Sequence, residues 1–399
     1  SGTLTWPAMV GSNTTTVSVG VLTGDSSGTL TWMDRTMAVL GTLPLSSMPT
    51  VSEFELPPVT AISLSDATWA VRQQRVYMVD AAGFSLTSVS VTVNAGATMV
   101  TPRVVNVANT KLTVSGSLGG VRSLSAGDGG QVTFMSGGNT LGSVSGYFDF
   151  DAVLVKGSGS VVVGAASVLN AVNVTTNNAA TVTLNDGGNL TCGVLYVDKS
   201  STVFVNGAVS IRVQNATFVS GSVVDGSGRG YGSGSGPGAG ASIAYGASHA
   251  ACGSQAVCNT AVTTANRVYG DVLQPSLPGS GGASGYYLGG GGGAAVRMVV
   301  GTLQLNATVM VDGGTGISSP SSSCTYCYGS GGGSGGSIWV SANTLLPSYG
   351  MLRSNGGNGA YGYSSSSTYN SYGGSGGRIA LTCATEMEQA ASSLTYRAW

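Results

Sequence analysis

Short runs of alternating apolar and polar residues recur from Lys111 onward, and this period of two is typical of half-buried β-strands. The runs read LTV, VTF, VLV, VVV, VNV, TVTL, VLYV, TVFV and IRV. Two series advance by about twenty residues each: Val153, Val172, Val194 and Ile211, and Val161, Thr181 and Thr202. This spacing predicts that residues 153–383 stack as coils of about twenty residues, at the inter-strand distance of a sheet. Two such coils would match the longer period of the glycine-rich unit described next. We therefore expect the first series to point into one apolar core.

A glycine-rich unit recurs in the last third of the chain, starting at Gly289, Gly331 and Gly373. Each copy has a Gly/Ser run, a short apolar strand, a turn and, where complete, a second strand and an Asp-Gly or Asn-Gly corner. Val296, Ile338 and Ile379 occupy equivalent places, 42 and 41 residues apart. A fixed period of this size predicts a repeat architecture in which each unit buries its apolar face against its neighbours. The fold predicted is all-β, a parallel β-helix (solenoid) with long Gly/Tyr-rich loops, preceded by a β-rich N-terminal domain.

The pattern divides the chain into three regions. Residues 1–107 contain SGTLTW twice and several alternating strands, which predicts a β-rich N-terminal domain, either sandwich-like or made of irregular coils. Residues 108–383 form the predicted β-helix, interrupted by an inserted loop at 226–293. Residues 384–399 lose the glycine pattern and are expected to form a tail or joining segment. The start inside an SGTLTW unit suggests that the chain begins within a longer pattern.

The composition narrows the class of protein. The 399 residues include 65 Gly, 42% are hydrophobic, 8% are charged, and the net charge is -1. A disordered chain normally combines low hydrophobicity with high net charge, so a folded protein is expected. The 15 Lys and Arg are scattered singly, without the basic stripe that nucleic acid requires. The sequence has no run of about 18 consecutive apolar residues, so no transmembrane helix is expected.

Several features favour secretion to the cell surface. Five sequons mark candidate N-glycosylation sites at Asn13, Asn173, Asn189, Asn215 and Asn306. Asn215 and Asn306 share the setting Asn-Ala-Thr and are expected at equivalent outward corners. Six cysteines, an even number, fit an oxidising compartment. We expect an extracellular glycoprotein.

The cysteines favour disulfides over zinc. Cys252 and Cys258 are candidates to close one loop tip, and Cys324 and Cys327 another. A zinc site would need a regular partner spacing that these pairs lack, even with His249 nearby. Cys192 and Cys383 could be free, buried or paired, because sequence cannot choose among the fifteen connectivities of six cysteines.

Catalytic chemistry is poorly supported. Asp149 and Asp151 lie two residues apart on one face of a strand and could act as paired carboxylates on a glycan. The competing interpretation is a solvated outer face, which the sparse acids along the chain favour. His249, the sole histidine, has no acid nearby in sequence, so a serine triad is not indicated. We expect no enzyme activity and no cofactor.

Tyrosines gather among the glycines, with twelve of sixteen between Tyr231 and Tyr372. Tyrosine favours interfaces, since it offers a broad contact area with a polar tip, although covering coil edges within the molecule is an equal alternative. Tyr396 and Trp399 in the tail are candidate self-assembly residues. A β-helix edge has unpaired backbone groups that need a cap or a neighbour. We expect head-to-tail self-association into a homopolymer, with 384–399 docking on the N-terminal domain of the next subunit.

The units GGGSGGSIWV, RSNGGNG and GGSGGRIAL resemble Gly-rich parallel β-helix repeat proteins of secreted or surface type from protists. The likeness covers roughly residues 210–383. It implies a mastigoneme-like or adhesin-like filament protein. The common Gly-His-Gly-Gly of the family is here Ser248-His249-Ala250-Ala251.

These observations predict an extracellular structural protein, a subunit of a self-assembling filament or surface coat. A second reading is an adhesin or glycan-binding protein that uses the tyrosine loops. A third is a degenerate β-helix polysaccharide lyase or hydrolase.

Overall fold

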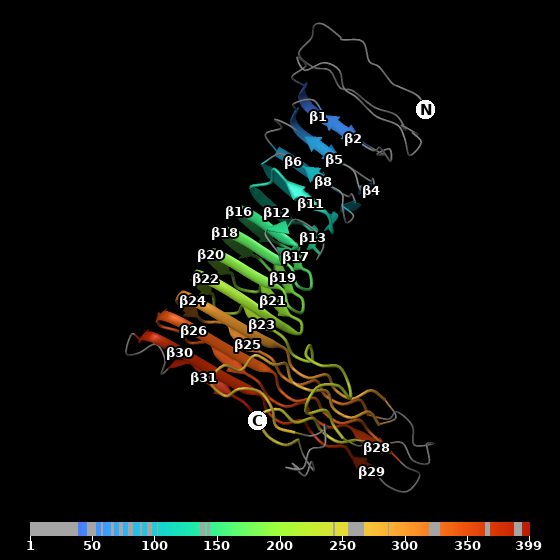
Figure 1. Cartoon of the computed structure of the whole chain (residues 1–399), viewed down its shortest axis with the longest axis vertical. Coiled ribbons are helices and arrows are strands. Elements are labelled where there is room, and N and C mark those ends of the chain that lie inside the picture. The colour runs from blue at the N-terminus through green and yellow to red at the C-terminus, as the bar shows by residue number, and fades with distance from the viewer. Residues whose placement is uncertain are drawn as a thin grey trace. The chain divides into compact units, whose positions relative to one another are not determined.

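The computed structural model is all-β, with its stacked strands in two parallel sheets, as in a parallel β-helix or solenoid-like fold (Figure 1). No α-helix occurs among the residues that it describes. These are residues 39–45, 53–56, 59–64, 68–71, 75–78, 83–87, 90–93, 98–101, 103–135, 140–141, 144–241, 244–253, 267–285, 287–318, 328–363, 368–386 and 393–399. Among these residues there is no helix that is long and apolar enough to cross a membrane.

The chain divides into two compact units, one of residues Ser1–Val182 with Leu190–Val194, the other of Thr183–Asn189 with Leu195–Trp399. Strands β19 (Thr181–Leu184) and β20 (Asn189–Val197) contain the division.

In the first unit, one sheet stacks every coil on the next in parallel. Its strands are β1 (Val39–Leu45), β3 (Val59–Leu64), β6 (Gly83–Thr87), β9 (Val104–Ala108), β12 (Ser123–Gly127), β16 (Tyr147–Lys156) and β18 (Val168–Asn177). The second sheet contains β4 (Thr68–Val71), β7 (Ser90–Val93), β10 (Lys111–Val114), β13 (Gln131–Phe134) and β17 (Ser160–Val163). A smaller sheet contains β2 (Glu53–Leu56), β5 (Arg75–Met78), β8 (Thr98–Val100) and β11 (Ser117–Gly119).

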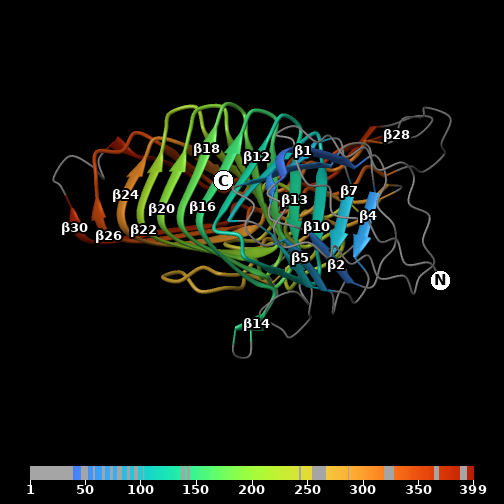
Figure 2. The same ribbon diagram turned by 90° about the horizontal axis from the view of Figure 1, so that it is seen from above.

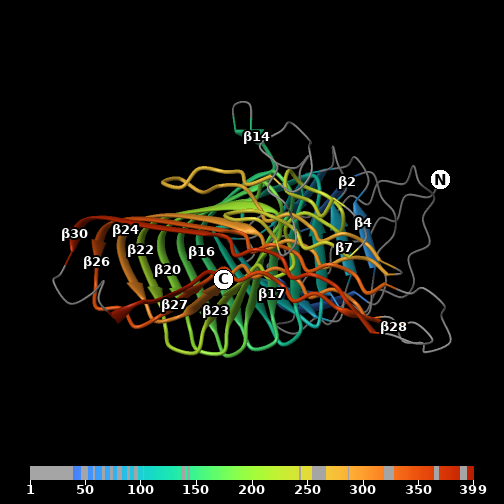
Figure 3. The same cartoon turned by 90° about the horizontal axis from the view of Figure 1, so that it is seen from below.

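In the second unit, the first sheet contains β22 (Ala208–Phe218), β24 (Ala295–Leu305), β26 (Ser337–Leu345) and β30 (Arg378–Glu386). The second contains β21 (Thr202–Val205), β23 (Val223–Asp225), β25 (Thr308–Met310), β27 (Met351–Arg353) and β31 (Thr395–Arg397). A hairpin of β28 (Tyr361–Tyr363) and β29 (Thr368–Asn370) lies apart from both sheets (Figure 3).

Coil length varies because of insertions. Lys111 pairs with Gln131, and Val153 pairs with Val174, so these coils have about the predicted length. The coil from Leu124 to its partner Val153 is longer. It includes a hairpin of β14 (Thr140–Leu141) and β15 (Val144–Ser145), which stands out from the stacked strands (Figure 2).

The Gly-rich period is confirmed as a structural repeat, although each unit is one long coil and not two. Val296 pairs with Ile338, and Ile338 pairs with Ile379, in parallel register. The prediction of twenty-residue coils as far as residue 383 is therefore wrong in this region. Ala208 pairs with Ala295, so the segment between β23 and β24 lies within a single coil.

The predicted core series is wrong at two of its four members. Val153 and Ile211 are buried, whereas Val172 is 57% exposed and Val194 is 39% exposed. Val153 pairs with Val174, which is buried. The reason is a corner in each long strand, where two consecutive residues face outward and the alternation restarts.

One carbonyl marks such a corner in β16. The N–H groups of Asp151 and Ala152 both donate to the carbonyl oxygen of Arg122, at 2.7 and 3.0 Å. Two adjacent donors that converge on one acceptor bend the strand. A search for strict period-two alternation therefore assigns Val172 and Val194 to the wrong face.

The Gly/Ser runs form an internal hydrogen-bonded layer without belonging to a sheet. From Gly331 to Gly336, successive N–H groups donate to three neighbouring segments in turn, with a period of three. The acceptors, in order, are the carbonyls of Ala283, Tyr372, Gly314, Ser280, Ser375 and Val311. Three residues per turn is the geometry of polyproline II. We call these runs the Gly-rich segments; they are residues 279–283, 290–293, 311–316, 331–336, 354–360 and 372–377.

Close approach explains why these segments are glycine. A Cβ placed on Gly333 would overlap the carbonyl oxygen of Gly291, and one on Gly336 would overlap that of Ala294. The obstacle is backbone and cannot rotate away. The glycines are thus required by packing, since any side chain would separate the segments.

Candidate functional site: the edge of the last coil

Strands β30 and β31 form the edge of the last described coil. Among the described residues, β30 pairs only with β26, and β31 pairs only with β27. Figure 3 shows β30 beside β26, and it marks the C-terminal end of the chain. A strand paired on one side offers backbone groups to another strand.

The apolar core is open at this edge. Leu352 and Ile338 are fully buried, but their partners in the last coil, Tyr396 and Ile379, are not. Tyr396 is 46% exposed and Trp399 is 76% exposed. A shallow hollow of about 490 Å³ is lined by Tyr396, Arg397, Ala398 and Trp399. Apolar surface normally buried by the next coil is therefore accessible here.

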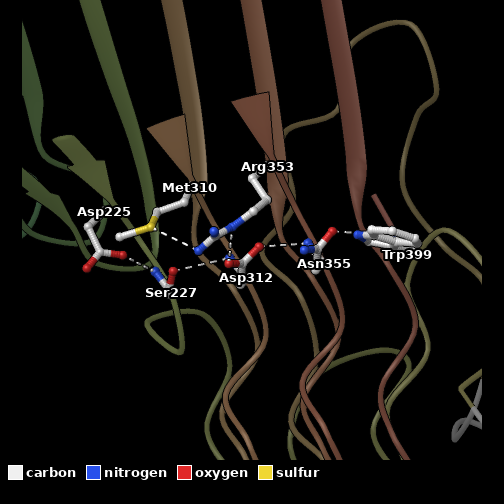
Figure 4. Close-up of polar contacts among 7 residues, drawn as sticks. All are labelled: Asp225, Ser227, Met310, Asp312, Arg353, Asn355 and Trp399. Carbon is white, nitrogen blue, oxygen red and sulfur yellow. Dashed lines mark hydrogen bonds and ion pairs between the residues drawn. The ribbon is translucent and has the colours of Figure 1, made fainter. Parts of the chain in front are cut away.

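A ladder of corner side chains runs along the second sheet to this edge (Figure 4). In each coil, a side-chain oxygen accepts the N–H of the corresponding residue in the next coil. Ser227 Oγ accepts from Asp312 N at 3.4 Å, and Asp312 Oδ1 accepts from Asn355 N at 2.8 Å. We call this series the corner ladder.

Arg353 reinforces the corner ladder. Its Nε donates to Asp312 Oδ2 at 2.6 Å, and its guanidinium contacts the sulfur of Met310 at 3.2 Å. Both partners of the Arg353–Asp312 pair are largely covered by protein. The sequence analysis identified the Asp-Gly and Asn-Gly corners but not Arg353. Its partner Asp312 lies 41 residues earlier in the chain, and no sequence motif links the two.

A second polar cluster lies deep within the Gly-rich segments. His249 is fully buried, its ring stacks on Tyr269 with centroids 4.5 Å apart, and its Nδ1 lies 2.7 Å from the carbonyl oxygen of Gly335. The N–H of His249 donates to Ser375 Oγ at 2.8 Å. Burial lowers the pKa of His249 to about 4, with Arg378 adding to the decrease and the Gly335 bond opposing it.

This cluster holds loops together and does not resemble a catalytic or metal centre. Neutral His249 leaves Nε2 without a hydrogen-bond partner, while the Tyr269 hydroxyl donates to Pro278 O at 2.7 Å. Burial raises the pKa of Tyr269 to about 12, so its hydroxyl keeps the proton. No group of three potential metal ligands occurs in the part of the chain that the structure describes.

The two aspartates considered as paired carboxylates, Asp149 and Asp151, interact with different partners. Asp149 and Asp151 are both exposed on β16, on its outer face. Asp149 Oδ1 accepts from Asn170 Nδ2 at 2.6 Å, and Asp151 lies 3.9 Å from Arg122 in an exposed ion pair. Each acid has its own partner, which is the arrangement of a solvated outer face.

The candidate glycosylation sites differ in setting. Asn173 and Asn215 are exposed within strands, and Asn189 is half-buried with its Nδ2 donating to Gly187 O at 2.9 Å. The expected equivalence of Asn215 and Asn306 is wrong: Asn215 pairs with Thr302, and Asn306 follows the end of β24. The register of β22 and β24 thus places the two sequons at different positions in their coils. Asn13 lies outside the described residues.

Among the cysteines, Cys252 is disulfide-bonded, while Cys192 and Cys383 are free thiols. Cys192 is buried, which raises the pKa of its thiol to about 12. Cys258, Cys324 and Cys327 lie outside the described residues, so their pairing stays a prediction.

Comparisons of the chain with protein-family models, with curated proteins and with solved structures found no match.

Proposed function

We propose that this chain is an extracellular structural protein, a parallel β-helix that serves as the subunit of a self-assembling filament or surface coat. The observation that carries the proposal is the open core at the last coil. Tyr396 continues a column of buried residues, Val224, Val309 and Leu352, yet remains half exposed. A further coil supplied by a neighbouring molecule would bury it and add strands beside β30 and β31.

Head-to-tail association supplies such a coil. In the first unit, β1 and β4 also pair on only one side among the described strands. A contact between different surfaces of identical molecules propagates into a filament unless its rotation closes a ring. The net charge of -1 leaves little long-range repulsion between copies.

Secretion and N-linked glycans form part of the proposal. The disulfide at Cys252 supports an oxidising compartment. Asn173 and Asn215 face outward from their strands, where a glycan has room. The proposal also includes the resemblance to filament proteins of protist surfaces, which is based on the Gly-rich units of residues 210–383.

The test compares the full chain with Trp399→Ser and Tyr396→Ser by light scattering and negative-stain electron microscopy. We expect the full chain to form filaments, and each variant to form fewer or shorter ones. Val172→Ser is the control, because Val172 is 57% exposed, between Tyr396 and Trp399, and lies on β18, which is not part of the last coil. A strictly monomeric full chain would refute the proposal.

A further inference from the structure

Three adjacent strands of the first sheet carry arginines and no acids. Strands β22, β24 and β26 lie side by side in parallel register (Figure 1). Their sequences are AVSIRVQNATF, AVRMVVGTLQL and SIWVSANTL, which contain Arg212 and Arg297 but neither aspartate nor glutamate. The net charge of the whole chain is -1, so the positive charge on these strands is a local feature.

Arg297 lies on the outer face of β24 and stacks on Trp339 of β26. The two residues are direct partners in the register, and the guanidinium carbon is 4.2 Å from the centre of the indole ring. Both side chains are half-buried, and the residues on either side of each are buried in the core. Stacking on an aromatic ring fixes the plane of the guanidinium without using its N–H donors.

The charge of Arg297 has no counter-ion. In the part of the chain that the structure describes, no acid forms an ion pair with Arg297, and its Nε is buried without a hydrogen-bond partner. The hydroxyl of Ser210, its partner on β22, is also buried and without a hydrogen bond. Two unsatisfied polar groups therefore lie side by side on this face. Buried polar groups normally have partners, so their presence calls for an explanation.

A second arginine shows the same stacking with its donor satisfied. The guanidinium carbon of Arg229 is 4.3 Å from the ring centre of Phe204, and its Nη1 donates to Asn206 Oδ1 at 2.9 Å. Arg297 has the ring contact but lacks an acceptor of this kind. The difference identifies Arg297, and not stacked arginines in general, as a cation that can bind an external anion.

We propose that the outer face around Arg297 and Trp339 binds an acidic polysaccharide, whose sugars carry carboxylate or sulfate groups. The half-buried guanidinium of Arg297 donates to the acidic group, as arginine does to oxyanions. Arg212, exposed on the adjacent strand and two residues further along, adds a second positive charge. The indole offers an apolar surface to the C–H groups of a sugar ring. On its other side the register partner is Ala380, which has only a methyl group.

The position of this face favours a polysaccharide over a peptide. Strands β24 and β26 are each paired on both sides, so they have no free backbone groups with which to add a peptide strand. The ligand is therefore recognised by side chains alone. An acidic polysaccharide carries charged groups and apolar ring faces in one chain, which matches a cation beside an indole. The site is also independent of self-assembly, since these strands lie in the interior of their sheet.

The binding test is calorimetric titration of the full chain with oligosaccharides of matched length. The probes are oligogalacturonate, which carries carboxylates, a sulfated galactan oligomer and a neutral galactan oligomer. We expect the acidic sugars to bind at least about tenfold more tightly than the neutral one, and more weakly as salt is added. Equal binding of the neutral sugar, or no binding of either acidic sugar, would overturn the proposal. Tighter binding of poly-glutamate would overturn the choice of a polysaccharide.

Two arginine variants of equal charge separate a site from general attraction. Arg297→Met keeps an apolar contact with the indole but removes the cation, and we expect it to lose at least about tenfold in affinity for the acidic sugars. Arg229→Met removes the other stacked arginine and should leave the affinity unchanged. Equal losses in the two variants would show non-specific attraction and contradict the site.

Trp339→Leu tests the contribution of the ring. We expect weaker binding of both acidic sugars, because leucine keeps an apolar side chain but offers no flat surface. Unchanged affinity would show that the indole does not contact the sugar. Circular dichroism checks that each variant is folded. The comparison of acidic with neutral sugars uses the unchanged chain, so it decides the proposal even if a variant fails to fold.

Discussion

The N–H of Trp399 donates to Oδ1 of Asn355 at 3.4 Å, and the N–H of Asn355 donates in the same way to Oδ1 of Asp312 at 2.8 Å (Figure 4). Trp399 thus occupies the next position of the corner ladder. An indole has no oxygen with which to accept the following N–H. The side-chain ladder therefore stops at the open edge, where any further coil has to be held by backbone pairing and by contact with the ring.

The corner ladder predicts unequal effects for two aspartates. Asp312→Ala removes the acceptor of Asn355 N and the partner of Arg353, leaving a largely covered cation unpaired. We expect a loss of about 2–4 kcal/mol in the free energy of unfolding, measured by urea denaturation.

Asp151→Ala is the control for this change. Its 3.9 Å pair with Arg122 is mostly solvent-exposed, and exposed ion pairs contribute little. We expect no measurable loss of stability. Similar effects of the two substitutions would mean that the ladder does not stabilise the coil.

The strand corner predicts opposite results for two valines in β18. Val174→Asp places an uncompensated charge at a buried position and should destabilise the protein by several kcal/mol. Val172→Asp, on the exposed corner, should change stability by less than about 0.5 kcal/mol. Thermal unfolding of both variants by circular dichroism provides the measurement. Reversed magnitudes would show that the register of β18 is wrong.

The Gly-rich segments predict that alanine is excluded at some glycines and accepted at others. In Gly333→Ala the new methyl group meets the backbone of Gly291, so we expect a large drop in melting temperature or failure to fold. Gly232 has no atom within 4 Å of an added Cβ. Gly232→Ala should leave the melting temperature unchanged or raise it slightly, since alanine restricts the unfolded chain. Equal destabilisation would contradict the close packing.

His249 predicts a decline in stability at mildly acidic pH. Its pKa in the folded protein is about 4, against 6.5 normally, so the unfolded chain takes up the proton first as pH falls. The stability that depends on neutral His249 is complete above about pH 6.5 and is lost progressively toward pH 4, by about 3 kcal/mol in total. Because the chain has one histidine, NMR of its ring protons should give this pKa directly.

His249→Asn is the control, since an amide can still donate toward Gly335 O but does not titrate. Its stability should be nearly independent of pH between 6.5 and 5. A ring that titrates near 6.5 in the folded wild-type chain would disprove the buried neutral state.

Glycan occupancy is predicted at the outward asparagines. Secreted protein should lose mass on enzymatic removal of N-linked glycans, and peptide mapping should locate glycans at Asn173 and Asn215, which are exposed. Asn306 is a more constrained site, because its Oδ1 accepts the N–H of Tyr349 at 3.0 Å. An unchanged mass after treatment of secreted protein would refute glycosylation.

The repeat of the fold could be predicted from sequence because it depends on identity at a fixed spacing. Val296, Ile338 and Ile379 are in direct register, as their period required. The faces of β18 and β20 could not be predicted, because the alternation restarts at a corner in each strand. In β16 the corresponding corner is held by hydrogen bonds to Arg122 in the preceding coil. A contact between coils of this kind cannot be recognised from the alternation of apolar and polar residues within one strand.

The open edge was only partly predictable. Tyr396 and Trp399 were identified from their position in a segment without glycines, and both are exposed. Gly332 and Gly335 were not distinguished from other glycines, because the carbonyls that accept from their N–H groups, those of Tyr372 and Ser375, lie about forty residues further along the chain. Sequence shows that the units repeat, but not which bond of each unit points to the next.

The bonds between equivalent Gly-rich segments all run in one direction, from N–H groups of one coil to carbonyls of the following coil. The glycine-rich layer is therefore polar: one side of it presents hydrogen-bond donors and the opposite side presents acceptors. Two such layers can stack in one order only, which fixes the direction of the chain from coil to coil.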